Sequence, residues 1–167
     1  NVNLAYESSV AAGIPIIKVL REGLAANEID WVAGIINGTG NFILTEMAAG
    51  QRKFEVVLKQ AQELGYAEAD PTFDIEGIDA AHKLTIIGSI AFGIPLQFNK
   101  TYTEGISKIT PEDISYADEL GYSIKHLGIA CRTDKGVEMR VHPTLISKIR
   151  WYSTVLRLRN QMRDHTK

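Results

Sequence analysis

The sequence is poor in the residues that mark several specialised classes of protein. It contains one cysteine, Cys131, among 167 residues, which excludes an internal disulfide framework and indicates a reducing compartment. Its four histidines are widely spread and show no zinc-ligand spacing. Lys and Arg (18) nearly balance Asp and Glu (20), so no excess of one charge predicts a nucleic-acid partner or an anionic membrane surface.

Long hydrophobic runs and targeting segments are also missing. No apolar run approaches the ~18 residues needed to cross a bilayer, and the N-terminus has no secretory pattern. We therefore expect a cytoplasmic protein without a membrane partner. The chain opens with Asn1-Val2-Asn3-Leu4 rather than Met, and we expect it to be a fragment. No GxGxxG pattern of a dinucleotide-binding domain occurs in it.

What remains is typical of one globular domain. The composition is 45% hydrophobic and 23% charged, which suits a chain that buries a single core. Periodicity predicts helices over 15–23, 42–49, 53–64, 78–92 and 111–120, and strands over 31–36, 100–105, 123–132 and 137–141. This order favours an α+β fold, with a mixed or antiparallel sheet and helices packed on one face, over alternating βαβ units.

Local signals predict how several of these elements begin and end. Asn41 or Thr39 could cap the helix over 42–49, and Thr110 the helix over 111–120. The turn over 134–136 should join the last two strands as a hairpin. Gly38-Thr39-Gly40 follows a strand as a phosphate loop would, but Ile43 occupies the place of the third glycine, so we interpret the segment as a turn.

The most informative stretch, residues 61–83, contains six acids and one lysine. Asp79 and Lys83 stand four residues apart on a predicted helix and therefore point the same way, while Glu68 lies in the preceding loop. A buried lysine beside carboxylates can donate or accept protons. The same spacing also occurs in routine surface ion pairs, so the catalytic and structural interpretations are about even. Asp70 and Asp74 are either supporting groups or solvated turn residues.

These residues carry a resemblance to a known family. The stretch resembles the signature of homoserine dehydrogenases, and residues 7–17, 36–39 and 141–146 are similar to other segments of that family. The matching signature residues are Ala61, Gly65, Tyr66, Ala67, Asp70, Pro71, Asp74, Ile75, Gly77, Asp79 and Lys83. The resemblance covers roughly residues 4–148. It implies a catalytic, substrate-binding and dimerisation domain over 1–148 without its nucleotide-binding domain, followed by a divergent basic tail over 149–167.

The resemblance also implies a reaction and a set of site residues. Homoserine dehydrogenases interconvert L-aspartate 4-semialdehyde and L-homoserine with NADP or NAD, in threonine, methionine and isoleucine biosynthesis. Lys83 matches the family's proton donor, and Glu68 and Asp79 match residues that hold the substrate. Asp79 should also influence catalysis through its proximity to Lys83. Gly65 matches a position close to the nicotinamide cofactor.

The resemblance further implies a cation site and a homodimer. Four residues match a monovalent-cation (sodium) site that uses mainly backbone oxygens: Glu7, Val10, Ala12 and Ile14. Two alternatives stay open, a non-catalytic dimerisation remnant and a piece of a bifunctional aspartokinase–homoserine dehydrogenase. Because half of the cofactor clamp is missing, we expect little or no dehydrogenase activity from the isolated chain.

Overall fold

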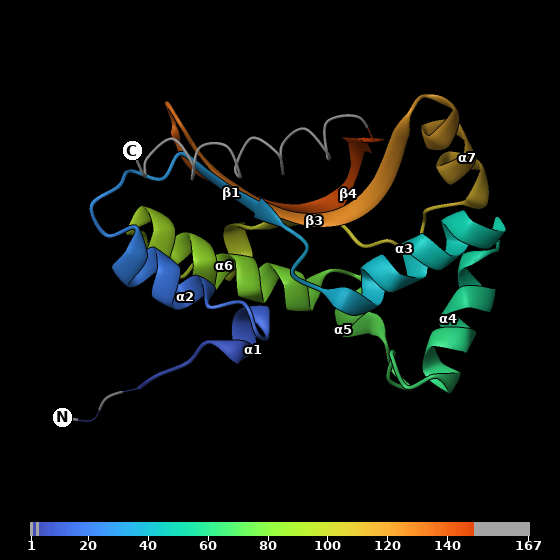
Figure 1. Ribbon diagram of the computed structural model, residues 1–167, viewed down its shortest axis with the longest axis horizontal. Helices are drawn as coiled ribbons and strands as arrows, with labels where there is room; N and C mark the ends of the chain where they lie inside the picture. The colour runs from blue at the N-terminus through green and yellow to red at the C-terminus, as the bar shows by residue number, and fades with distance from the viewer. Residues whose placement is uncertain (1, 3, 149–167) are drawn as a thin grey trace, which may run out of the picture.

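A computed structural model describes residue 2 and residues 4–148 of the chain. Its centre is a four-stranded mixed sheet in the order β1-β3-β4-β2. The strands are β1 (Trp31–Gly34), β2 (Tyr102–Thr103), β3 (Tyr122–Thr133) and β4 (Gly136–Ser147). Figure 1 shows α2 and α6 lying along one face of this sheet and α3 and α4 grouped toward one end. The predicted α+β fold is confirmed. The predicted tail over 149–167 lies outside the described residues.

The two long strands form the predicted hairpin. β3 and β4 pair antiparallel from Tyr122 opposite Ser147 to Thr133 opposite Gly136. The prediction that the last strand ends at residue 141 was wrong, because β4 continues to Ser147. The strand thus includes Pro143, although proline cannot donate a hydrogen bond to a ladder.

The position of Pro143 explains why the strand tolerates it. Pro143 lies opposite His126, whose backbone N–H and carbonyl both bond to Asn41, away from β4. The pair is therefore a non-hydrogen-bonded one, and the nitrogen of Pro143 faces away from β3. Beyond Val141, β2 no longer pairs with β4, so no ladder bond is lost on that side.

Every predicted helix is present at least in part, but several begin or end at other residues than predicted. Predicted best were α4 (Phe54–Glu63), α6 (Ile78–Phe92) and α7 (Pro111–Glu119), the last with Thr110 in a capping box. The predicted helix over 15–23 is instead α2 (Ile16–Lys18) followed by a π-helical turn, η1 (Val19–Gly23). Of the predicted strand over 100–105, only the two residues of β2 are strand, and Lys100 is the last residue of a 3₁₀ turn, η2 (Phe98–Lys100). Two short helices were not predicted: α1 (Ser8–Ala11) and α5 (Thr72–Ile75).

The remaining helix, α3 (Gly38–Gly50), begins four residues earlier than predicted. Its N-cap is Asn37, whose side-chain oxygen accepts from the backbone N–H of Gly40. The proposed caps Thr39 and Asn41 lie inside the helix, so that prediction was wrong. The two glycines, which had indicated a turn, form its first turn instead.

Helix α6 contributes side chains to two clusters of the hydrophobic core. On its sheet side, Leu84 packs with Ala130 and Val141. On another side, Ile87 packs with Ile17 and Leu20 of the N-terminal helices. A separate cluster joins α3 and α4 to α7. Because Ala80, Ala81 and Leu84 are buried, the first two turns of α6 are covered by neighbouring elements.

The helices of the described residues include none that is both long and apolar enough to span a membrane.

Candidate active site

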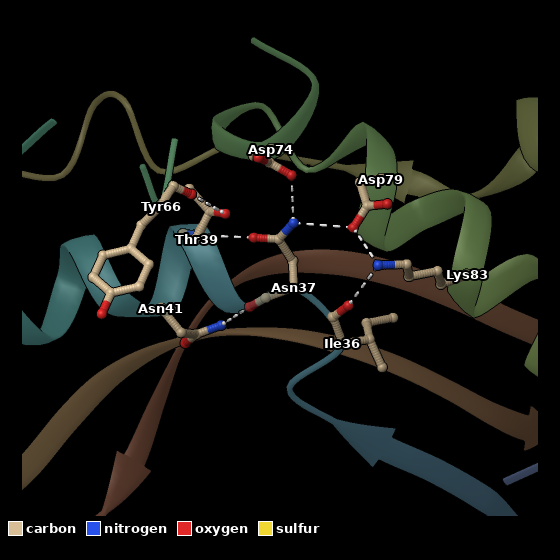
Figure 2. Close-up of polar contacts among 9 residues, drawn as sticks. Ile36, Asn37, Thr39, Asn41, Tyr66, Asp74, Asp79 and Lys83 are labelled. Carbon is tan, nitrogen blue, oxygen red and sulfur yellow. Dashed lines mark hydrogen bonds and ion pairs between the residues drawn. The ribbon is translucent and has the colours of Figure 1, made fainter. Parts of the chain in front are cut away.

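The start of α6 brings a lysine and a carboxylate together. Asp79 lies in the first helical turn, where the helix dipole favours a negative charge. One turn later, Lys83 Nζ lies 2.8 Å from Asp79 Oδ2 and 3.5 Å from the backbone oxygen of Ile36. The side chains of Lys83 and Asp79 are 25% and 21% exposed. They are thus only partly shielded from water. Figure 2 shows the Lys83 ammonium directed toward the Asp79 carboxylate.

Asn37 joins this pair to a second carboxylate. Its Nδ2 donates to Asp79 Oδ2 at 3.0 Å and to Asp74 Oδ1 at 2.7 Å. The connection after β1 therefore meets the adjacent helices α5 and α6, whose acids lie 37 and 42 residues later in the sequence, at one amide (Figure 2). Asp74 belongs to the site's network, whereas Asp70 is exposed and accepts from the backbone N–H of Thr72 as a turn residue.

Asn41 connects the site to the sheet. Its Nδ2 donates to the backbone oxygens of Asn37 and His126, at 3.0 and 2.9 Å, and its Oδ1 accepts from the His126 N–H at 3.0 Å. By the β1–β3 register, the strand partner of His126 would be Ile36, two residues beyond the last pair. Because Ile36 has turned away toward Lys83, the Asn41 amide instead bonds to the backbone N–H and carbonyl oxygen of His126 on β3.

The His126 ring fills the space beneath the two helix starts. It is 2% exposed, and a Cβ on Gly77 would lie 2.9 Å from its Cε1. Its Nε2 lies 2.9 Å from the carbonyl oxygen of Glu104, which can only accept, so Nε2 carries the hydrogen. Nδ1 is buried and finds no partner among the described residues. Burial lowers the pKa of His126, and the Glu104 hydrogen bond only partly opposes that shift.

Glu68 and Gly65 lie outside this network. Glu68 is exposed, and within the described residues its carboxylate makes no hydrogen bond or ion pair, although its backbone oxygen accepts from Gln62. Gly65 is exposed with φ +77 and follows Leu64, the C-cap of α4. Its N–H bonds to Gln62 and that of Tyr66 to Ala61, as in a Schellman motif. Of the predicted trio, the structure brings together Asp79 and Lys83 but not Glu68.

The segment proposed to bind a monovalent cation contains a strained turn. Ala12 has φ 50 and ψ −117, a backbone conformation unfavourable for a residue with a Cβ. Within the described residues, the carbonyl oxygens of Val10 and Ala12 accept no hydrogen bond, whereas those of Glu7 and Ile14 do. The Glu7 carboxylate bonds to the N–H groups of Ile17 and Lys18 at the start of α2. No cluster of three or more acidic, His or Cys side chains that could hold a metal exists in the described part of the chain.

Sequence reasoning missed two residues of this region. Asn37 was noted only as part of a similar segment, although an asparagine directly before Gly-Thr-Gly is a preferred helix cap. His126 was not singled out, because nothing in a strand pattern tells a buried histidine from an exposed one. His82, the neighbour of Lys83 in the sequence, is exposed and lies edge-on to the rings of Phe73 and Phe98.

Comparison with known proteins identifies the class and then the family. The chain is related to oxidoreductases, and the sequence model of the homoserine dehydrogenase family matches residues 15–167. The chain belongs to the homoserine dehydrogenase family. The matched range continues past residue 148, where we expected the resemblance to end, so the division of the chain at that residue stays a prediction.

Individual relatives agree with this assignment. A homoserine dehydrogenase of Pseudomonas aeruginosa is 68% identical over 154 residues, which are 92% of this chain and 36% of that protein. The crystal structure of a homoserine dehydrogenase from Thiobacillus denitrificans has 69% identity and a TM-score of 0.85, over 86% of this chain and 33% of that one. A hyperthermophilic archaeal homoserine dehydrogenase in complex with NADPH has 29% identity and a TM-score of 0.70, over 86% and 40%. The chain thus spans about a third of the length of these relatives.

Proposed function

We propose that this chain is the substrate-binding and catalytic part of a homoserine dehydrogenase, which interconverts L-aspartate 4-semialdehyde and L-homoserine. The observation that carries the proposal is the ion pair of Lys83 with Asp79, partly shielded at the start of a covered helix. A lysine in that setting is unusual unless it has a partner or a task. Because the chain belongs to a dehydrogenase family, we propose that this task is proton transfer during reduction of an aldehyde.

Lys83 is the proton donor in this proposal. When an aldehyde is reduced, negative charge develops on its oxygen, and an ammonium group at that point stabilises the charge before it delivers the proton. Asp79 holds the ammonium in place through the 2.8 Å contact and, with Glu68, binds the α-ammonium group of the substrate by charge-assisted hydrogen bonds. Because Glu68 is exposed and separate from the pair, we propose that it closes over the site when the substrate binds.

A nicotinamide cofactor, NADP or NAD, would supply the hydride. Gly65 is suited to border it, because the exposed backbone there has nothing within 4 Å of the position that a Cβ would take, which leaves room for a flat ring to approach. A related archaeal structure was determined with NADPH. The helices and strands of residues 4–148 form no dinucleotide-binding fold, so the rest of the binding surface must come from other chain segments.

A sodium ion would fit the segment from Glu7 to Ile14. The strained turn at Ala12 leaves the carbonyl oxygens of Val10 and Ala12 available to it, and hard cations prefer such ligands. The Glu7 carboxylate, already bonded to the start of α2, would contribute its charge more than its coordination. The ion would offset the cost of the turn and fix the loop that packs against α6.

We also propose a cytoplasmic homodimer that forms across the open face of the sheet. By strand alternation this face carries apolar side chains on β1 and β3, among them Trp31, which is 62% exposed, and Ile129, beside polar side chains on β4 such as Arg140. An exposed aromatic and aliphatic group with charged neighbours is a composition that protein interfaces use. The domain division at residue 148 and the biosynthetic role in making threonine, methionine and isoleucine belong to the same proposal. The cytoplasmic location fits the single cysteine.

The test is turnover by a chimera. The chain replaces the corresponding segment of the full-length Pseudomonas aeruginosa relative, to which it is 68% identical. We expect NADPH-dependent reduction of aspartate semialdehyde, a loss of about 10²-fold or more in Lys83→Met, and no such loss in Lys59→Met, a matched exchange of an exposed lysine on α4. A folded chimera that turns over no aspartate semialdehyde, or that tolerates Lys83→Met, would contradict the proposal.

A further inference from the structure

The side chain of Asn37 does more than cap a helix. Its Oδ1 accepts the N–H of Gly40 at 2.9 Å, which completes the capping of α3. Serine, threonine or aspartate would do this equally well. Capping therefore accounts for the hydrogen bond of Oδ1, but it does not require the Nδ2 amide group, which serine and aspartate lack. The residue is 5% exposed, so that nitrogen must find its partners within the protein.

Those partners are two carboxylates, and each takes one of the two amide hydrogens. Asp74 Oδ1 lies 2.7 Å and Asp79 Oδ2 3.0 Å from Nδ2. The orientation of the amide is settled by these contacts, because a flipped group would turn its oxygen toward both acids and its NH₂ toward an N–H donor. The amide thus reduces the repulsion between two negative groups that it holds near one another.

The same Asp79 oxygen also binds Lys83 at 2.8 Å. With Oδ2 held from two directions, the carboxylate cannot rotate, and the ammonium is drawn toward one fixed point. Of the three Lys83 hydrogens, one points to Asp79 and one toward the more distant Ile36 oxygen. In the part of the chain that the structure describes, the third has no acceptor and is available to a ligand.

The anchor of Asn37 is the sheet itself. Its backbone oxygen accepts from Asn41, whose amide is bonded at both ends to the backbone of His126 on β3. A group supported in this way from a central strand is more precisely placed than one on a free loop. The contacts therefore run from β3 through Asn41, Asn37 and Asp79 to the Lys83 ammonium. Figure 2 shows this path from Asn41 onward.

We propose that Asn37 is a positioning residue for the reaction assigned above. It ties Asp74 to Asp79 and holds Asp79 Oδ2 against Lys83, so that the ammonium is preorganised where the substrate oxygen will lie. The kinetic consequence rests on the proposed function, whereas the tie between the two acids does not.

Two variants separate this role from capping. Asn37→Ser keeps a good helix cap and removes both donations to the acids. Asn37→Asp keeps the shape and the cap but turns an oxygen toward Asp74 and Asp79. Asn27→Asp, at an exposed position, controls for the added negative charge. The charged or titratable groups around Asn37 are Asp74, Asp79 and Lys83, with the His126 ring beneath.

The tie is tested on the 167-residue chain by NMR. We expect the Asn37 side-chain NH₂ pair, identified by its loss in Asn37→Ser, to exchange with water far more slowly than that of Asn27. Equal exchange rates for the two amides would overturn the tie, whatever the enzyme assays give.

The positioning role is tested in the chimera. We expect kcat to fall about 10- to 100-fold in Asn37→Ser, in line with a displaced catalytic group, with a melting temperature close to that of the unaltered chimera. Asn37→Asp should fall further and shift the pH dependence of kcat/KM, which Asn37→Ser and Asn27→Asp should not. A folded Asn37→Ser enzyme with kcat and KM within twofold of the parent would overturn the role, whereas an inactive parent chimera would instead count against the proposed function.

Discussion

At the scale of single residues, the question for Asp79 and Lys83 is whether the pair serves stability or chemistry. Both side chains retain about a fifth to a quarter of their exposure, and ion pairs that water reaches contribute only about 0.2–1 kcal/mol. The pair therefore contributes little to the free energy of unfolding. Its shared contact with Asn37 favours a functional role.

Asp79→Asn separates the two roles. We expect the free energy of unfolding of the chain to change by no more than about 1 kcal/mol, and kcat/KM of the chimera to fall by at least about 10²-fold, because the ammonium loses its fixed partner. Urea denaturation and steady-state kinetics measure the two quantities. Large destabilisation with unchanged turnover of the folded fraction would identify the pair as structural.

His126 makes a prediction about pH. Burial lowers its pKa in the folded state, whereas in the unfolded chain the imidazole takes up a proton near pH 6.5. Below that pH the unfolded state binds more protons, so the free energy of unfolding falls as the solution is acidified from about pH 6.5, by up to ~1.4 kcal/mol per pH unit.

Urea denaturation of the chain between pH 5 and 7.5 measures this slope. His126→Gln should be less stable at neutral pH but should show a flatter dependence between pH 5 and 6.5. His82→Gln, which replaces an exposed histidine, should leave the slope unchanged. A wild-type slope retained by His126→Gln would contradict the assignment.

Some residues of the site were predictable from sequence and others were not. Helical spacing was sufficient to place Asp79 and Lys83 together, because a four-residue separation has one geometric outcome on a helix. It could not place Asn37, whose acidic partners are 37 and 42 residues away. Such contacts depend on how separate elements pack, and local patterns do not contain that information.

At the scale of elements, the same distinction explains which predictions failed. Helices with a local end signal were predicted nearly to their ends: Gly65 follows the C-cap of α4, and Thr110 caps the start of α7. β4 was cut short at Pro143, because its tolerance there depends on the register with β3. The break between α1 and α2 depends on the turn at Ala12 and on Glu7, which reaches forward to bond the start of α2.

Two glycines at the ends of helices provide an element-scale test. Gly65 and Gly77 have nearly the same dihedral, φ +77 and +78, but differ in surroundings. A Cβ at Gly65 meets nothing within 4 Å, whereas at Gly77 it would meet His126 at 2.9 Å. We expect Gly65→Ala to cost about 1 kcal/mol of unfolding free energy, from the dihedral alone.

Gly77→Ala should cost at least ~1 kcal/mol more than Gly65→Ala, because the new methyl group also displaces the His126 ring. Urea denaturation of the two variants under one set of conditions gives the difference. Equal losses would mean that the contact between the start of α6 and β3 is loose.

At the scale of the whole molecule, the chain spans about a third of the length of its relatives. The proposed site includes a proton donor and residues that bind the substrate. For the cofactor, the described residues offer only the exposed backbone at Gly65, because they form no dinucleotide-binding fold. We therefore expect the purified chain to show no NADPH-dependent reduction of aspartate semialdehyde above background, although the chimera is active. Turnover by the chain alone would show that this segment binds the cofactor unaided.

The open face of the sheet predicts self-association. Ile129 lies on β3 opposite Ala33 and Arg140, near the middle of that face. We expect sedimentation equilibrium to detect a dimer, and Ile129→Lys to weaken it by at least about 10²-fold, because a positive charge would be buried in the interface opposite Arg140. Val56→Lys, at an exposed position on α4, should have no effect. A wild-type monomer at high concentration would contradict the homodimer.

The Asn41 amide occupies the place of a strand partner for His126. This contact makes the length of the connection between β1 and α3 critical. Residues 35–41 must leave the sheet, start a helix at Asn37 and return a side chain to the backbone of His126. One inserted residue would rotate either the cap or the amide out of place, whereas the exposed connection over 25–28 has no such constraint. Among relatives that share the chemistry, we expect this connection to keep its number of residues and its asparagines at positions 37 and 41.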